Sequence, residues 1–215
     1  SDYFMWASSH DYFAPTMLAR CVAELEARPD AVICCGRTAL FDTDPKDAEL
    51  YEEVQGIDDD SPYERFRAIS QGLRVNNLVH GLIRTEVLAS TPLVDDYYSS
   101  DNVLIAQLAL TGKILQLPEV LFYRRWDPDA STSRMSEQER RRHWDPDNRG
   151  MTRYTHWKIN RGYIRAVLRT DVERRERRRA LTLALKGLYW DRHRLARDLG
   201  DGVRELWARR HPKEG

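Results

Sequence analysis

The sequence has few cysteines and no long apolar segment, and both shortages narrow the class of protein. Three cysteines are too few for a disulfide framework, and all of them fall in segments that read as core, so we expect buried free thiols at Cys21, Cys34 and Cys35. No apolar run approaches the ~18 residues that span a bilayer. The start also lacks the basic segment and apolar run of a secretory signal. We therefore expect a reducing, cytoplasmic setting.

The charge of the chain is unevenly distributed along its length. The 215 residues are 41% hydrophobic and 32% charged, which suits one domain with a sizeable core and an appendage. Residues 1–150 hold 16 Lys and Arg against 26 Asp and Glu, whereas residues 151–215 hold 18 against 8. The sequence therefore predicts an acidic body of net charge −10 followed by a basic extension of net charge +10.

The stretch from Tyr3 to Pro15 reads as a short strand, a polar corner that carries Asp11, and the start of a helix. Pro15 suits the first helical turn, where its missing N–H costs nothing. A buried helix face is predicted by apolar residues at helical spacing: Leu18, Cys21, Val22 and Leu25. An acid between a strand and a helix lies at the carboxyl edge of an α/β sheet, where ligands bind.

The following segments predict further strands and helices. We expect a buried strand over Ala31–Gly36, and a helix capped by Ser61 with Pro62 and Glu64 in its first turn. A strand from Asn77 to Ile83 is interrupted by Gly81, which indicates a close approach of backbone or ligand.

The last part of the body is predicted to be a helix followed by two strands. The helix covers Asn102–Thr111, and Asp101 lies at its start, where an ordinary N-cap would also explain it. Strands over Ile114–Leu117 and Val120–Tyr123 flank Pro118.

The stretch from Phe41 to Asp60 is strongly acidic, with nine Asp and Glu against a single Lys. One interpretation is a solvated loop. The other is an insertion over a binding site that helps to select a substrate.

Three segments in order resemble the later part of family-2 glycosyltransferases of the GT-A fold: "YFMWASSHDYFAPTMLARCVAELEARPDAVICCGR", Asn76–Leu88 and Ser99–Arg125. The resemblance covers Ser1 to Arg134. It implies an α/β fold with an incomplete Rossmann-like mixed sheet, whose nucleotide-binding half would precede Ser1. We expect a GT-A core over 1–134, a linker or lid over 135–150 and a basic helical extension over 151–215. The isolated chain is then expected to bind the nucleotide base weakly.

The resemblance implies sugar transfer from a nucleotide-sugar donor to an acceptor hydroxyl with inversion, in polysaccharide or glycolipid assembly. It makes Asp101 the general base and Asp11 the contact to metal and diphosphate. Further implied donor-side residues are His10, Arg124 and Arg125; implied acceptor-side residues are His80, Gly81 and Ser100.

Two positions depart from the pattern of that family. Tyr12 stands where a second acid is usual, and Trp126 stands where a histidine often ligates the metal. Mn²⁺ or Mg²⁺ is therefore expected to bind weakly, or Arg124 and Arg125 are expected to neutralise the diphosphate instead. The departures also leave open a non-catalytic sugar-binding or scaffolding module.

The basic extension reads as helical from Met151 onward, with apolar stripes in its second half: Leu181, Ala184, Leu185 and Leu188, then Leu195, Leu199, Val203 and Leu206. Helix core with a solvated basic face is the simplest interpretation. An anionic membrane surface also suits a basic amphipathic helix with tryptophans, so the chain could be peripheral at a membrane. Nucleic-acid binding is the weaker alternative, because no reader motif accompanies the charge.

Overall fold

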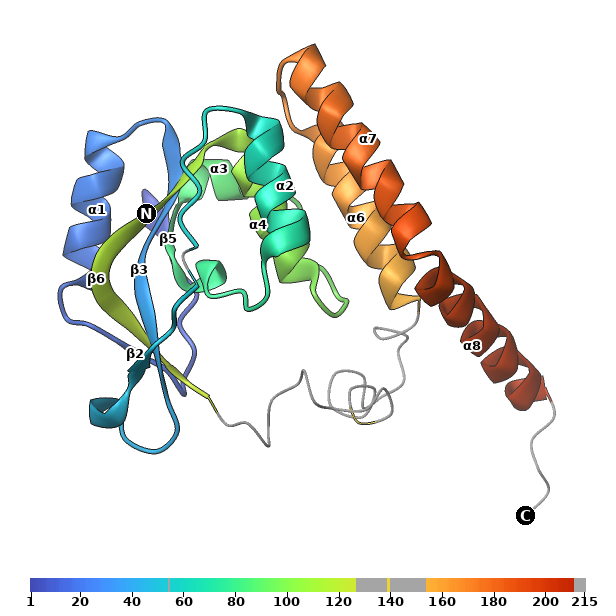
Figure 1. Ribbon diagram of the computed structural model, residues 1–215, viewed down its shortest axis with the longest axis horizontal. Helices are drawn as coiled ribbons and strands as arrows, with labels where there is room; N and C mark the ends of the chain where they lie inside the picture. Colours follow the sequence, from blue (N-terminus) through green and yellow to red (C-terminus); the bar gives the residue numbers. More distant parts are fainter. Residues whose placement is uncertain (54, 127–138, 140–153, 211–215) are drawn as a thin grey trace.

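The computed structural model describes residues 1–53, 55–126, 139 and 154–210 and gives a mixed α/β fold (Figure 1). The strands are β1 (Tyr3–Phe4), β2 (Tyr12–Phe13), β3 (Ala31–Phe41), β4 (Glu49–Leu50), β5 (Leu82–Arg84) and β6 (Lys113–Arg125). The α-helices are α1 (Met17–Ala27), α2 (Pro62–Gly72), α3 (Thr85–Ala89), α4 (Ser100–Thr111), α6 (Thr155–Arg169), α7 (Arg174–Trp190) and α8 (Arg192–Arg210). Two short 3₁₀ turns are η1 (Pro45–Asp47) and η2 (Leu78–His80).

The sheet is built around the long parallel pair β3 and β6. The strand order is β1-β5-β3-β6-β2, with β4 on the end of β3, and every pair other than β3–β6 is antiparallel. The expected strand over Ala31–Gly36 continues to Phe41. The two strands expected on either side of Pro118 are one strand, because the register shifts there and the missing N–H falls at an irregularity in the ladder.

Two hydrophobic clusters cover the two faces of the sheet, with α1 on one side and α2 and α4 on the other (Figure 1). Cys34 belongs to the α1 side and its neighbour Ile33 to the α4 side, as the alternation of a strand requires. All three cysteines are buried free thiols, as expected.

The helix starts follow local chemistry with two differences. Ser61 caps α2 as expected, its Oγ accepting from the Glu64 N–H at 3.3 Å. Helix α1 begins at Met17, two residues after Pro15, so Met17 is buried in place of Leu18, which is exposed. Helix α4 begins at Ser100, which places Asp101 inside its first turn.

The region expected as a strand from Asn77 to Ile83 is a 3₁₀ turn followed by the short strand β5. Asn76 accounts for the difference, because its Oδ1 accepts from the Val79 N–H at 3.3 Å and closes a turn. This turn brings Asn76, Asn77 and His80 together ahead of β5.

The basic extension is helical wherever it is described, and its first two helices belong to the core. The side chains of Val167, Ala180 and Leu183 are buried in the cluster that contains Phe66 and Leu104. Figure 1 shows α6 and α7 side by side, with α8 running on from α7 away from the sheet. Within the expected apolar stripes, Leu195 is buried but Leu185, Leu199 and Val203 are exposed. The expected linker or lid over 135–150 lies, but for residue 139, outside the described residues.

Candidate functional site

Four of the expected site residues come together from distant parts of the chain. Asp11 lies just before β2, His80 ends η2, Asp101 lies in the first turn of α4, and Arg124 is near the end of β6. Strand β2 pairs with the end of β6, and the backbone N–H of Arg125 donates to Asp11 Oδ1 at 2.9 Å. The charges of Asp11, Asp101 and Arg124 all act on His80, which places the four groups in one electrostatic neighbourhood.

Arg124 supplies the cation of this site. Its Nη1 donates to Asn77 Oδ1 at 2.6 Å, and its Cζ lies 5.9 Å from the ring centroid of Trp126. Burial lowers the pKa of Arg124, while the negative charges of Asp11 and Asp101 act in the opposite direction. An arginine keeps its proton under any physiological condition, so the site holds a fixed positive charge.

Asp101 is held in place by a neighbouring amide. Asn76 Nδ2 donates to Asp101 Oδ2 at 2.9 Å, and the Asn76 carbonyl is itself fixed by the Val79 N–H. The first turn of a helix stabilises a carboxylate through its free N–H groups and the helix dipole. The arrangement therefore presents an oriented carboxylate whose charge acts on the Arg124 cation.

His80 is a neutral histidine with a defined tautomer. Its Nδ1 lies 3.0 Å from the Trp6 carbonyl oxygen, which can only accept, so Nδ1 carries the hydrogen and donates it. Burial lowers the pKa of His80; the Trp6 hydrogen bond, Asp11 and Asp101 oppose this effect, and Arg124 adds to it. Because the pKa stays below its ordinary value, Nε2 presents a lone pair at neutral pH.

The other expected site residues have different surroundings. Arg125 points to the opposite side of the strand, where Nη2 donates to the Thr43 carbonyl at 3.5 Å. Gly81 packs against β3, since a Cβ there would lie 2.8 Å from Ile33 Cγ2. Ser100 is buried, and its Oγ donates to the Asp95 carbonyl at 2.8 Å. His10 is exposed. These four positions are thus occupied by packing, capping and surface contacts.

Two asparagines that hold site residues were not predicted from the sequence. Asn76 holds Asp101, and Asn77 holds Arg124. The side chain of Asn77 is 4% exposed, and its Nδ2 has no hydrogen-bond partner among the described residues. Adjacent amides directly before an apolar turn were the only signal in the sequence.

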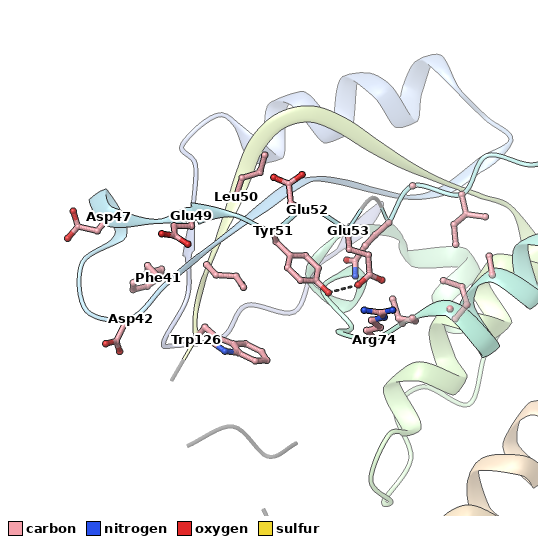
Figure 2. Close-up of a pocket in the computed structure, with 18 of the residues that line it drawn as sticks. Phe41, Asp42, Asp47, Glu49, Leu50, Tyr51, Glu52, Glu53, Arg74 and Trp126 are labelled. Carbon is pink, nitrogen blue, oxygen red and sulfur yellow. Dashed lines mark hydrogen bonds between the residues drawn. The ribbon is translucent and has the colours of Figure 1, made fainter. Parts of the chain in front are cut away.

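An open groove adjoins the site on the side of Trp126 (Figure 2). Its volume is about 1490 Å³, and the acidic stretch forms much of its wall. The acidic residues that line it are Asp42, Asp44, Asp47, Glu49, Glu52, Glu53, Asp58 and Asp59. Figure 2 shows Tyr51 donating its hydroxyl to Glu53, with Arg74 close by. Burial first, and Glu53 second, raise the pKa of Tyr51 to about 12, so this hydroxyl keeps its proton.

The residues present offer little to a metal ion. Within the described ranges, no three His, Cys, Asp or Glu side chains gather as ligands. At the expected metal position Asp11 is the carboxylate, and it already accepts from the Arg125 N–H. Two residues differ from the family pattern in which further metal ligands are usual: Tyr12 is exposed on β2, and Trp126 lies against Arg124. These residues therefore fit a metal ion poorly.

Comparison of the sequence with protein-family models and with curated proteins finds no match.

Proposed function

We propose that this chain forms the acceptor-side half of an inverting glycosyltransferase that moves a sugar from a nucleotide-sugar donor to an acceptor hydroxyl. The observation that supports the proposal is that the charges of Asp11 and Asp101, from two other segments of the chain, act on Arg124, while Asp101 and Arg124 are each held by an asparagine. A hydrogen-bonded carboxylate beside a fixed cation suits a reaction in which a proton leaves one group and negative charge develops on another.

In the proposed reaction, Asp101 takes the proton of the acceptor hydroxyl. The oxygen then forms a bond to the anomeric carbon of the donor sugar, and the bond from that carbon to the nucleoside diphosphate breaks on the opposite side. The configuration is inverted, and the bonding electrons leave with the diphosphate. Asn76 keeps the base oriented through Oδ2. A positioned general base of this kind contributes about 10²- to 10⁴-fold to a rate.

Arg124 is the residue proposed to stabilise the leaving diphosphate. A guanidinium bonds phosphate oxygens in pairs and is most effective when it is held in place and partly shielded from water. Asn77 and Trp126 hold Arg124 from two sides.

The groove beside Trp126 is proposed to receive the acceptor. Its wall combines Tyr51, Leu50 and Phe41 with carboxylates, and carboxylates accept hydrogen bonds from sugar hydroxyls. An aromatic ring such as Trp126 offers a flat apolar surface on which the C–H face of a sugar ring can lie.

The test is transfer from a panel of nucleotide sugars, with Mn²⁺ or EDTA, by the chain alone and in its natural full-length context. We expect Asp101→Asn to lower kcat by at least about 10²-fold, because the amide cannot take the proton. Asp96→Asn, an exposed carboxylate in the preceding loop, is the matched control and should retain activity. Folded protein without turnover on any donor, or equal activity of the two variants, would remove the enzyme proposal.

A non-catalytic sugar-binding module is the second candidate. The observation in its favour is that Tyr12 and Trp126 occupy the positions of two expected metal ligands while the groove remains open. Saccharide binding in calorimetry that is unchanged in Asp101→Asn, with no transfer, would support it.

A further inference from the structure

The long helical arm made of α7 and α8 has two stripes of apolar residues, and among the described residues one stripe is packed against α6 while the other is exposed. The first stripe includes the buried Leu195 and lies along α6, whose Trp157 Nε1 donates to the Leu195 carbonyl at 3.1 Å. The second stripe follows positions 185, 189, 192, 196, 199 and 203 at alternating spacings of four and three residues, with Arg192 and the small Ala196 between its larger apolar members, and all six positions are exposed. Its apolar members, with their exposed fractions, are Leu185 (49%), Tyr189 (65%), Leu199 (49%) and Val203 (65%).

The charged residues of the same arm are sorted by sign. Residues 174–204 contain ten Lys and Arg against four acids. Three of the acids are held by neighbouring helices: Glu176 accepts from Ser61 of the α2 cap, Asp191 from Asn160, and Asp198 from His156. The fourth, Asp201, accepts from Arg204 one turn away. The acids are therefore engaged in internal contacts, which leaves a surface of apolar and cationic side chains.

Aromatic side chains mark the middle of this surface. The Arg192 guanidinium lies 4.6 Å from the ring centroid of Tyr189, and it also donates to the Tyr189 carbonyl at 3.0 Å. Trp190, next to this pair, is 53% exposed. Paired aromatic and basic side chains of this kind suit the boundary between lipid headgroups and acyl chains.

We propose that the exposed stripe of α7 and α8 lies on an anionic lipid bilayer. In the part of the chain that the structure describes, no helix is long and apolar enough to cross a bilayer, so contact is with its surface. A second copy is a poorer occupant, because it would bring two cationic faces together. A nucleic acid would use the cations but would leave four aliphatic or aromatic side chains without a purpose.

The test is co-sedimentation of the chain with vesicles of phosphatidylcholine alone or mixed with phosphatidylglycerol, at two salt concentrations. We expect binding to the anionic vesicles that weakens with salt, and little binding to phosphatidylcholine. Leu199→Ser combined with Val203→Ser should lower the partition coefficient about tenfold or more, because two side chains that enter the interface are lost. Arg192→Gln combined with Arg197→Gln should also lower the partition coefficient, by roughly fivefold for each charge that is removed.

The matched control is Leu18→Ser, an equally exposed leucine on α1 at the other end of the molecule (52% exposed). It should bind as the wild type does. All substituted positions are exposed, so circular dichroism should be unchanged. Equal binding to both kinds of vesicle, or wild-type binding by the Leu199 and Val203 double variant, would overturn the proposal. The proposal would also be overturned if the wild type bound no lipid and instead formed a dimer in sedimentation velocity or was retained on double-stranded DNA, and if the double variant abolished that dimer or that retention.

Discussion

Arg124 and Arg125 are neighbours on β6, yet only Arg124 faces the site, because successive side chains of a strand point to opposite sides. Arg124→Lys should keep the positive charge but lose the paired donors, and we expect kcat/KM to fall by about tenfold or more. Arg125→Lys is the control and should stay within about twofold. Initial transfer rates at low donor concentration measure both, and equal losses would contradict the proposed role of Arg124.

His80 should make stability depend on pH near neutrality. Its pKa in the folded state is below the ordinary value of 6.5, mainly through burial, so the unfolded chain binds the proton more tightly. The stabilising contribution is therefore complete above about pH 6.5 and is lost as the pH falls towards the folded pKa. Urea unfolding at pH 7.5 and pH 5.5 should show a loss of free energy of unfolding on acidification.

The control for this effect is a second histidine in the same part of the chain. His80→Gln should reduce the dependence on pH, whereas His10→Gln should not, because His10 is exposed. If the free energy of unfolding depended on pH equally in the wild type and in His80→Gln, the burial of His80 would not be the cause of that dependence.

At the scale of single residues, the ionisable residues of the site were predicted from the sequence, and the asparagines that orient them were not. Asp11, His80, Asp101 and Arg124 could be named because their chemistry and order match a known pattern. Asn76 and Asn77 could not, since an amide in a loop has neither periodicity nor a pKa to distinguish it. Their roles depend on the turn that Asn76 itself closes.

Among the elements, the pair of β3 and β6 is packed closely enough to be sensitive to added volume. A Cβ at Gly36 would lie 2.4 Å from Leu121 Cβ and 2.9 Å from the Glu119 carbonyl. Gly36→Ala should therefore destabilise the protein by about 1–3 kcal/mol, since backbone and core must both shift. Gly72→Ala, at the end of α2 with no atom within 4 Å, should be neutral or slightly stabilising. Urea denaturation of both variants tests this, and a stable Gly36→Ala would refute it.

Elements were predicted well where the signal is local and poorly where distant packing decides. Ser61 and Pro62 fix the start of α2 through contacts within one turn. The buried face of α1 was misplaced at Leu18 because periodicity alone cannot choose between adjacent apolar residues such as Met17 and Leu18. Pro118 was taken as a break, but the bulge that accommodates it exists only in the pairing with β3.

For the whole molecule, the helical extension should be required for folding of the body. Val167, Ala180, Leu183 and Ala184 complete the cluster over α2 and α4. A buried Val or Leu side chain contributes roughly 1.5–3 kcal/mol and a buried alanine methyl group about 0.8 kcal/mol, whereas domains are stable by only about 5–15 kcal/mol. A chain that ends at Arg125 should therefore lose cooperative unfolding and bind a hydrophobic dye.

A chain that ends at Asp191 is the matched truncation. It removes α8 but keeps α6 and α7, so it should unfold cooperatively with little loss of stability in the body. A well-folded product ending at Arg125 would contradict this account of the core.

The order of strand and helix signals predicted the α/β class, and the charge pattern predicted the change of charge after residue 150, but neither predicted this sharing of the core. Charge separates the extension from the body in the sequence, whereas the buried residues of α7 are partly small alanines that give a weak signal. The expected fold family and site residues rest on resemblance to the sequence pattern of a known family, and local physical chemistry alone does not predict them. The expected chemistry therefore stays a prediction.

The order of the strands has a consequence for the timing of biosynthesis. Tyr12 pairs with Tyr123, and β3 finds its parallel partner only in β6. At roughly 5–20 residues per second, the ribosome needs about 5–20 s to make the chain between those two tyrosines. Throughout that interval β2 has no partner strand and β3 lacks its parallel partner, so the nascent chain must stay free of aggregation until β6 is made. Codon usage and chaperone access over this interval should then influence the yield more than the final stability does.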